Sequence, residues 1–195
     1  MNSRRTRMAA CVPFLTAVLA ACSTAGPEAG SANTGAPSRN NPTPSSTSAA
    51  SPPSVPERPD SANGLSLAAA EGFVRYYSSL LNYASATGNA APMLGASDPG
   101  CENCKGYADF VRKSNGANGL MKGDYAERVG EVAELVQGES GRVGGSATIQ
   151  VGLYVSRRTP TDTPFTSKAT TYTREFALSA RSANWVMYEM KLVER

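Results

Sequence analysis

Histidine is absent from all 195 residues of the chain. Its side chain has the ordinary pKa closest to neutrality, and it is the commonest metal ligand in proteins. Its absence excludes Ser-His-Asp and Cys-His catalysis, a histidine general base and histidine metal ligands. Chemistry near neutral pH would therefore have to use carboxylates, tyrosines, lysines or thiols.

The chain also has little excess of either charge. It holds 19 basic and 16 acidic side chains, and three of the basic ones, Arg4, Arg5 and Arg7, lie at the extreme N-terminus. The rest of the chain therefore has 16 basic and 16 acidic side chains. A general nucleic-acid-binding protein needs a concentrated excess of lysine and arginine to displace counterions from the phosphate backbone. The balance argues against nucleic acid as a partner.

Long hydrophobic runs are missing as well. The apolar stretch from Met8 to about Val18 is too short for a bilayer, which needs about 20 apolar residues. Three arginines precede it and small residues follow it, which is typical of a secretory signal peptide. The pattern predicts a cleaved signal peptide over residues 1–21. The pair Arg4-Arg5 leaves a twin-arginine route open beside the general secretion route.

The end of this segment, Leu19-Ala20-Ala21-Cys22, resembles the bacterial lipobox. The resemblance implies transfer of diacylglycerol to the Cys22 thiol and cleavage just before that residue. Two or more acyl chains anchor a protein durably, whereas one chain binds only marginally. We therefore expect a lipoprotein on the extracytoplasmic face of the cell membrane, with the membrane as its partner through Cys22.

Residues 22–60 predict a disordered tether. They are rich in Pro, Ser, Thr, Ala, Gly and Asn, lack aromatics, and contain Val55 as their one large aliphatic residue. Such a segment cannot bury enough apolar surface to offset its chain entropy. Its reach would lie between roughly 35 Å for a flexible coil and about 120 Å for polyproline II.

Residues 61–195 predict one globular domain. Apolar spacings of three and four indicate helices, with Ser66 as the first N-cap and Gly88 near its end. On the third helix, Tyr107, Phe110 and Val111 are expected to face inward. Alternation with a period of two then indicates strands, and Gly130 is a candidate bulge. The predicted elements are helices over 67–84, 92–96 and 101–113 and strands over 125–136, 146–155, 170–178 and 184–193. On the strand over 146–155, the residues predicted to share one face are Ala147, Ile149, Val151, Leu153 and Val155.

Helices that precede four antiparallel strands predict an α+β fold. This order resembles the nuclear transport factor 2-like cone. The resemblance implies N-terminal helices packed against a curved antiparallel four-stranded sheet.

A second resemblance rests on local sequence. The segment 76–84 reads YYSSLLNYA, Thr87-Gly88 follows it, and Ser97-Asp98 precedes the segment 101–105, CENCK. Over residues 64–193, with the lipobox and tether, these features are similar to an uncharacterised lipoprotein family of high-GC Gram-positive bacteria. An acidic residue often follows Thr-Gly in that family, whereas Asn89 stands here. The family has no known function, so the likeness implies no activity.

Cys101 and Cys104 predict a structural disulfide, because an extracytoplasmic location favours oxidation. A thiol oxidoreductase is an alternative, since a cysteine at a helix N-terminus has a lowered pKa. However, thioredoxin-like proteins place this motif directly after a strand, and no strand is predicted here. Two cysteines without histidine cannot complete a tetrahedral zinc site within one chain, and dimerisation or carboxylates would have to supply the remaining ligands. We expect neither a metal nor a cofactor.

Aromatic residues with a polar group could line a pocket between helix and sheet, although such residues more often belong to the core. The candidates are Tyr77, Tyr83, Tyr107 and Trp185. Glu127, Glu131 and Glu134 are predicted to lie on the solvent-facing side of their strand.

The leading hypothesis is a non-catalytic, lipid-anchored module that binds a small apolar ligand or an envelope protein. The first alternative is a small isomerase, cyclase or hydrolase of the same fold. It requires a buried Asp or Glu within hydrogen-bond reach of a tyrosine hydroxyl. The second alternative is a thiol redox protein that uses Cys101 and Cys104.

Overall fold

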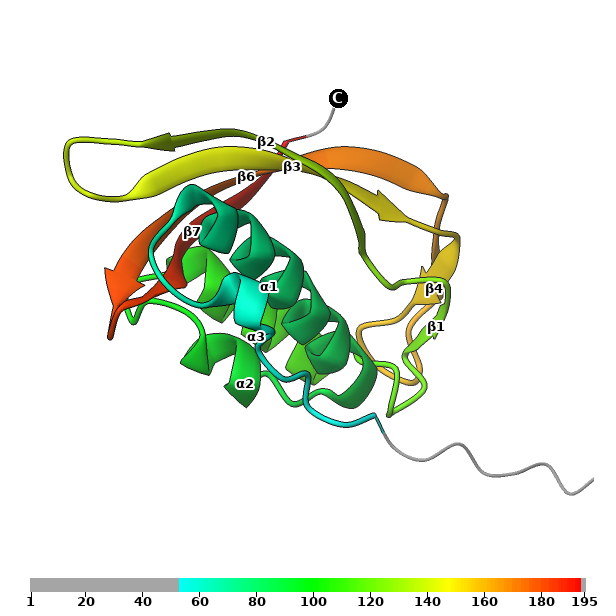
Figure 1. The fold of residues 1–195 in the computed structure, drawn as a ribbon. Coiled ribbons are helices and arrows are strands. Elements are labelled where there is room, and N and C mark those ends of the chain that lie inside the picture. The colour runs from blue at the N-terminus through cyan, green and yellow to red at the C-terminus, as the bar shows by residue number, and fades with distance from the viewer. Residues whose placement is uncertain (1–52, 194–195) are drawn as a thin grey trace, which may run out of the picture. The chain divides into compact units, whose positions relative to one another are not determined.

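A computed structural model describes residues 53–193 of the chain. The predicted signal peptide, Cys22 and most of the predicted tether lie outside the described residues. The helical elements, in chain order, are η1 (Asp60–Ala62), α1 (Leu67–Thr87), α2 (Ala91–Gly95) and α3 (Glu102–Lys113). The strands are β1 (Met121–Gly123), β2 (Arg128–Gln137), β3 (Val143–Val151), β4 (Tyr154–Ser156), β5 (Phe165–Ser167), β6 (Thr170–Arg181) and β7 (Asn184–Val193). Helices precede strands, and the mixed α+β class is confirmed (Figure 1).

The long helix α1 begins and ends where the sequence predicts. The Ser66 hydroxyl accepts a hydrogen bond from the Ala69 amide at 3.0 Å, which caps the N-terminus. Gly88, at a φ of 76°, adopts the left-handed conformation that ends many helices. Between these caps, one face of the helix is buried against the rest of the domain. Its residues recur at spacings of three and four and include Phe73 and Leu80.

Helix α3 buries a narrower stripe than expected. Cys104, Ala108 and Val111 are buried, whereas Phe110 is 46% exposed. The expectation that Phe110 faces inward is wrong. Successive residues of an α-helix lie about 100° apart around its axis, so Phe110 turns towards solvent when its neighbour Val111 faces the core. Tyr107 is partly buried, with its ring 6.2 Å from the Phe110 ring, centroid to centroid.

The strands form two antiparallel sheets. The larger has the order β2-β3-β6-β7, and the smaller has the order β1-β4-β5. The register between β2 and β3 shifts between Val129 and Val132, at the bulge predicted for Gly130. In Figure 1 the larger sheet lies across α1, and α1 contacts β2, β3 and β7. The core between them contains Phe73, Leu80, Leu81, Ile149, Leu178, Trp185 and Met187.

The predicted strand over 146–155 is in fact two strands. β3 ends at Val151, and the chain then passes to β4 in the other sheet. Leu153, predicted to share the buried face, is 58% exposed in this connection. Alternation of apolar residues continues through the change of sheet, so the sequence pattern does not reveal it. β1 and β5 were not predicted, since three residues are too few to establish a period.

The range predicted for the tether, residues 22–60, includes residues that pack against the domain. Arg58 lies within it, yet its guanidinium stands 4.9 Å from the centroid of the Phe73 ring and 5.3 Å from that of Tyr76. It also donates to the carbonyl oxygens of Ala62 and Trp185, at 3.3 and 3.1 Å. These contacts fix Arg58 against α1 and β7. Among residues 53–193, no helix combines the length and apolarity needed to cross a bilayer.

Candidate functional site

A buried ion pair joins the start of β2 to β6. Glu127, directly before β2, accepts hydrogen bonds from both terminal nitrogens of Arg174, at 2.6 and 2.8 Å. The Arg174 and Glu127 side chains are only 4% and 8% exposed. The prediction that Glu127 faces solvent is therefore wrong. The sequence does not reveal this burial, because a charged residue at the start of a strand usually lies at the surface. The partner that buries Glu127, Arg174, is 47 residues away in the sequence.

Two hydroxyls complete the surroundings of the Glu127 carboxylate. Tyr172 donates to Oε1 at 3.0 Å, and Ser78 donates to Oε2 at 3.2 Å. Burial, and then the negative charge of Glu127, raise the pKa of Tyr172, which keeps its hydroxyl protonated as a donor. Burial alone would lower the pKa of Arg174, but attraction and hydrogen bonding to Glu127 outweigh it and raise that pKa. The carboxylate thus accepts four hydrogen bonds, which matches its acceptor capacity.

The backbone of Glu127 is held by one side chain of α1. The Asn82 amide nitrogen donates to the Glu127 carbonyl oxygen at 2.9 Å, and the Glu127 amide donates to Asn82 Oδ1 at 2.7 Å. Asn82 and Ser78 are four residues apart, so they lie on the same face of the helix. Sequence reasoning missed this pair. The available signal was a run of polar residues at helical spacing, Ser78, Asn82 and Ser85, beside the apolar stripe.

A cavity of about 260 Å³ adjoins the ion pair, between α3 and strands β6 and β7. Its lining residues are Asn103, Tyr107, Arg174, Met190, Lys191 and Leu192. Two of their polar groups are already bonded: Tyr107 shares a hydrogen bond with the Ser85 hydroxyl at 2.8 Å, and Asn103 donates to the Met190 carbonyl at 2.8 Å. Within residues 53–193, Arg174 Nε is the one buried side-chain nitrogen or oxygen without a hydrogen-bond partner.

A larger groove of about 640 Å³ lies between α3 and the smaller sheet. The aromatic residues Phe110 and Phe165 line it, and they are 46% and 68% exposed. It contains no buried polar atom that lacks a partner among the described residues. The smaller cavity beside Arg174 is therefore the better candidate for a specific site.

Comparison with known proteins identifies the family. Residues 31–191 match the family described as "Family of unknown function (DUF6318)". The chain belongs to DUF6318. No curated protein matches the sequence.

The solved structures that are similar to the DUF6318 chain include the following two. The intermembrane space region of the chloroplast protein ARC6 aligns with a TM-score of 0.50 and 16% identity, over 67% of this chain and 98% of that one. An Rd1NTF2 variant aligns with a TM-score of 0.38 and 10% identity, over 64% and 99%. At such low identity, the likeness to the ARC6 region shows a shared fold and nothing about function.

Of the four aromatic residues proposed for a pocket in the DUF6318 chain, Tyr107 lines the cavity. Tyr77 lies in the core with its hydroxyl 2.8 Å from that of Ser97, and burial raises its pKa to about 12. Trp185 is also buried in the core, and its indole nitrogen donates to the Ser66 carbonyl at 3.0 Å. Tyr83 is half-buried and accepts a hydrogen bond from Asn89 at 3.4 Å.

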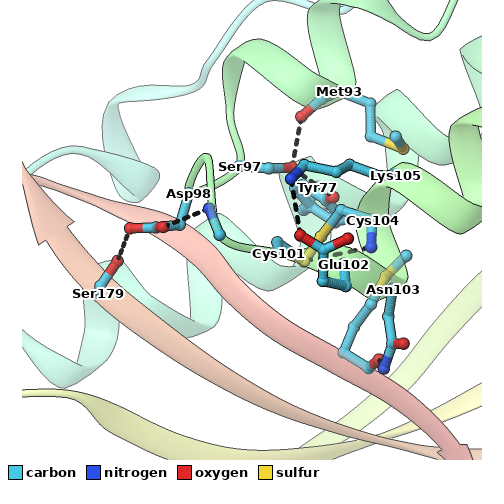
Figure 2. The surroundings of a disulfide bond; sticks show 12 residues. Tyr77, Met93, Ser97, Asp98, Cys101, Glu102, Asn103, Cys104, Lys105 and Ser179 are labelled. Carbon is cyan, nitrogen blue, oxygen red and sulfur yellow. Dashed lines mark hydrogen bonds and ion pairs between the residues drawn. A yellow bond between two sulfur atoms is a disulfide. The ribbon is translucent and has the colours of Figure 1, made fainter.

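The predicted disulfide between Cys101 and Cys104 is present at the start of α3 (Figure 2). The two residues are 1% and 0% exposed. Cys101 Sγ accepts a hydrogen bond from the Cys104 amide at 3.2 Å, so it also caps the helix. Asp98, just before the disulfide, accepts hydrogen bonds from the Gly100 amide and the Ser179 hydroxyl. The described side chains include no cluster of three or more potential metal ligands.

Proposed function

We propose that this DUF6318 protein is a non-catalytic binding module, anchored by lipid on Cys22 to the extracytoplasmic face of the cell membrane. The lipobox-like sequence before Cys22 supports the anchor, and the Pro/Ser/Thr-rich segment supports a spacer between membrane and domain. The observation that carries the binding role is the cavity beside Arg174, where a buried donor has no partner within the described chain.

We further propose that the domain is a nuclear transport factor 2-like cone. The helices precede the strands, and the sheet order β2-β3-β6-β7 places the C-terminal hairpin beside β3. The long α1 runs under this sheet (Figure 1). In such an arrangement a cavity between helices and sheet is a natural place for a small ligand.

The surroundings of Glu127 support a non-catalytic role. A general base must accept a proton from its substrate, and this needs a free lone pair within hydrogen-bond reach. All four acceptor positions of Glu127 are taken by Arg174, Tyr172 and Ser78. The ion pair therefore serves to shape the wall of the cavity and to present Arg174 there.

One observation favours the alternative of a small enzyme. Glu127 is buried and lies 3.0 Å from the Tyr172 hydroxyl, which is the geometry that this alternative requires. It would also require Arg174 to release the carboxylate when substrate binds. A catalytic role predicts that envelope extract incubated with the protein yields a product that is lost with Glu127→Gln and retained with Tyr83→Phe. No such Glu127-dependent product is expected for a binding module.

The binding role can be tested by native mass spectrometry of the full-length protein, extracted gently from its own envelope. We expect a reproducible non-covalent adduct. Leu192 lines the cavity and is 56% exposed, so Leu192→Trp should fill the mouth and remove the adduct. Leu153→Trp is the matched control, because Leu153 is 58% exposed and lies outside this cavity. A bare mass for the wild type, or equal loss in both variants, would contradict the proposal.

The anchor has a separate test in the same spectra. The covalent mass should correspond to a chain that begins at Cys22 and carries acyl chains. Cys22→Ser should abolish both the lipid mass and the recovery in the membrane fraction. A wild-type chain without lipid would refute the anchor and leave the binding role intact.

A further inference from the structure

We propose that the cavity between α3 and strands β6 and β7 binds a compact, largely apolar molecule that carries a neutral hydrogen-bond acceptor, such as a ketone or ester carbonyl. The acceptor is bound by Nε of Arg174. This inference rests on the proposed binding function and adds the chemical class of the ligand.

The first argument is the unpaired donor. Both terminal nitrogens of Arg174 donate to Glu127, which fixes the guanidinium and leaves Nε without a partner. Arg174 is 4% exposed and lines the cavity. A buried N–H that makes no hydrogen bond costs free energy comparable to a lost bond. Nε itself has almost no accessible surface in this structure, so the side chains around it must shift to admit a ligand acceptor, which would then recover that free energy.

The second argument is charge. The unit charges of Arg174 and Glu127 cancel within a hydrogen-bonded pair. Lys191 also borders the cavity, and it pairs in register with Glu175. Successive residues of a strand face opposite sides of the sheet, so Lys191 and Met190 point in opposite directions. Because Met190 is buried on the core side, the Lys191 side chain belongs to the outer face. A ligand carboxylate would therefore gain no net positive charge and would lie near Glu127. A neutral acceptor avoids both penalties.

The third argument is size and polarity. A volume of about 260 Å³ lies just below the roughly 300–1,000 Å³ of ordinary small-molecule pockets. The ring of Tyr107 and the side chains of Met190 and Leu192 supply apolar walls. The hydroxyl of Tyr107 and the amide nitrogen of Asn103 already have partners. The ligand therefore needs an apolar body of about two small rings and one acceptor.

The test uses three probes with one skeleton: 2-acetylnaphthalene, 2-naphthoate and naphthalene. Full-length protein labelled with 15N-arginine is placed in lipid nanodiscs, and empty nanodiscs correct for partitioning of the probes into lipid. The NMR signal of the Arg174 Nε–H group reports its hydrogen bonding directly. We expect the ketone to bind at least tenfold more tightly than naphthalene and to shift this signal downfield. Naphthoate should bind more weakly than the ketone.

Each other outcome overturns the inference. Tightest binding by naphthoate would show an anion site. Equal binding of the ketone and naphthalene without a shift at Nε would show an apolar cavity that ignores Arg174. Leu192→Trp should abolish binding of the ketone, and Leu153→Trp should retain it. If no probe binds although the natural adduct is seen by mass spectrometry, this inference fails and the proposed function stands.

Discussion

Each terminal nitrogen of Arg174 donates to a different oxygen of Glu127, at 2.8 and 2.6 Å, and both side chains are less than a tenth exposed. The pair connects β6 to the start of β2. Ser78 and Asn82 extend the connection to α1. One buried polar network therefore ties the long helix to two strands of the larger sheet, beside the cavity.

Breaking the ion pair from one side should be costly. Glu127→Met or Arg174→Met leaves the other charge buried without a partner, and such changes cost about 3–5 kcal/mol of the free energy of unfolding. The double variant leaves no buried charge, so it should be less destabilised than either single variant. Urea unfolding of the four proteins measures this coupling.

The exposed ion pair between Lys105 and Glu102 provides a control for that cycle. Its side chains are 50% and 78% exposed, and an exposed pair contributes at most about 1 kcal/mol. Lys105→Met should therefore leave the unfolding midpoint almost unchanged. Additive losses in the double variant of Glu127 and Arg174 would show that the two residues stabilise the fold independently.

The Asn82 side chain should be essential for the position of Glu127. Asn82→Ala removes both hydrogen bonds to the Glu127 backbone and should cost about 2 kcal/mol, since it leaves a partly buried N–H and C=O unpaired. Asn82→Asp retains an acceptor for the Glu127 amide. However, its carboxylate repels the Glu127 carbonyl oxygen and places a negative charge near the Glu127 side chain. Asp should therefore destabilise the protein more than Ala does. The measurement compares the free energies of unfolding of the two variants. A higher value for the Asp variant than for the Ala variant would contradict the role assigned to Asn82.

Local signals in the sequence predict most of the elements. Ser66 and Gly88 bracket α1 because capping depends on neighbouring residues alone. The hairpin of β6 and β7 follows from period-two alternation on either side of a short turn. Its turn residues, Ser182 and Ala183, have positive φ values of 50° and 60°, as both central residues of a type I′ turn do.

The candidate site depends on contacts that no local pattern contains. Glu127 meets Arg174 and Ser78 only after the sheet has formed and packed on α1, across separations of 47 and 49 residues. A glutamate at the start of a strand is ordinarily solvated, so its burial requires knowledge of the partner. Leu153 illustrates the same limit, because alternation cannot show that the chain leaves one sheet for another.

The disulfide should behave as a structural bond. Both cysteines are almost fully buried, so millimolar dithiothreitol should reduce it slowly in the native protein and rapidly in urea. Cys101→Ser with Cys104→Ala keeps a helix-capping oxygen and loses the bond, at a cost of about 2 kcal/mol in the chain-entropy approximation. Cys101→Ala with Cys104→Ala should cost about 1 kcal/mol more, because the cap is also lost. Rapid reduction of the native protein would instead favour the redox alternative.

Stability should fall steeply at alkaline pH because of buried tyrosines. Burial raises the pKa of Tyr77 to about 12, and burial together with the charge of Glu127 raises the pKa values of Tyr107 and Tyr172. In the unfolded chain tyrosine titrates near 10. Below that pH both states are protonated and the stability is complete. Between about 10 and 12 the unfolded state loses protons that the folded state retains, so the free energy of unfolding falls by about 1.4 kcal/mol per pH unit for each such tyrosine.

Urea unfolding between pH 8 and 11.5 measures this slope. Tyr77→Phe removes one titrating phenol and should make the alkaline loss shallower. Ser97→Ala is the matched control, because it removes the hydrogen bond to Tyr77 but keeps the phenol. It should lower stability at every pH without flattening the slope. If Tyr77→Phe and the wild type lose stability equally from pH 10 upward, the unfolding at alkaline pH arises elsewhere and Tyr77 does not contribute to it.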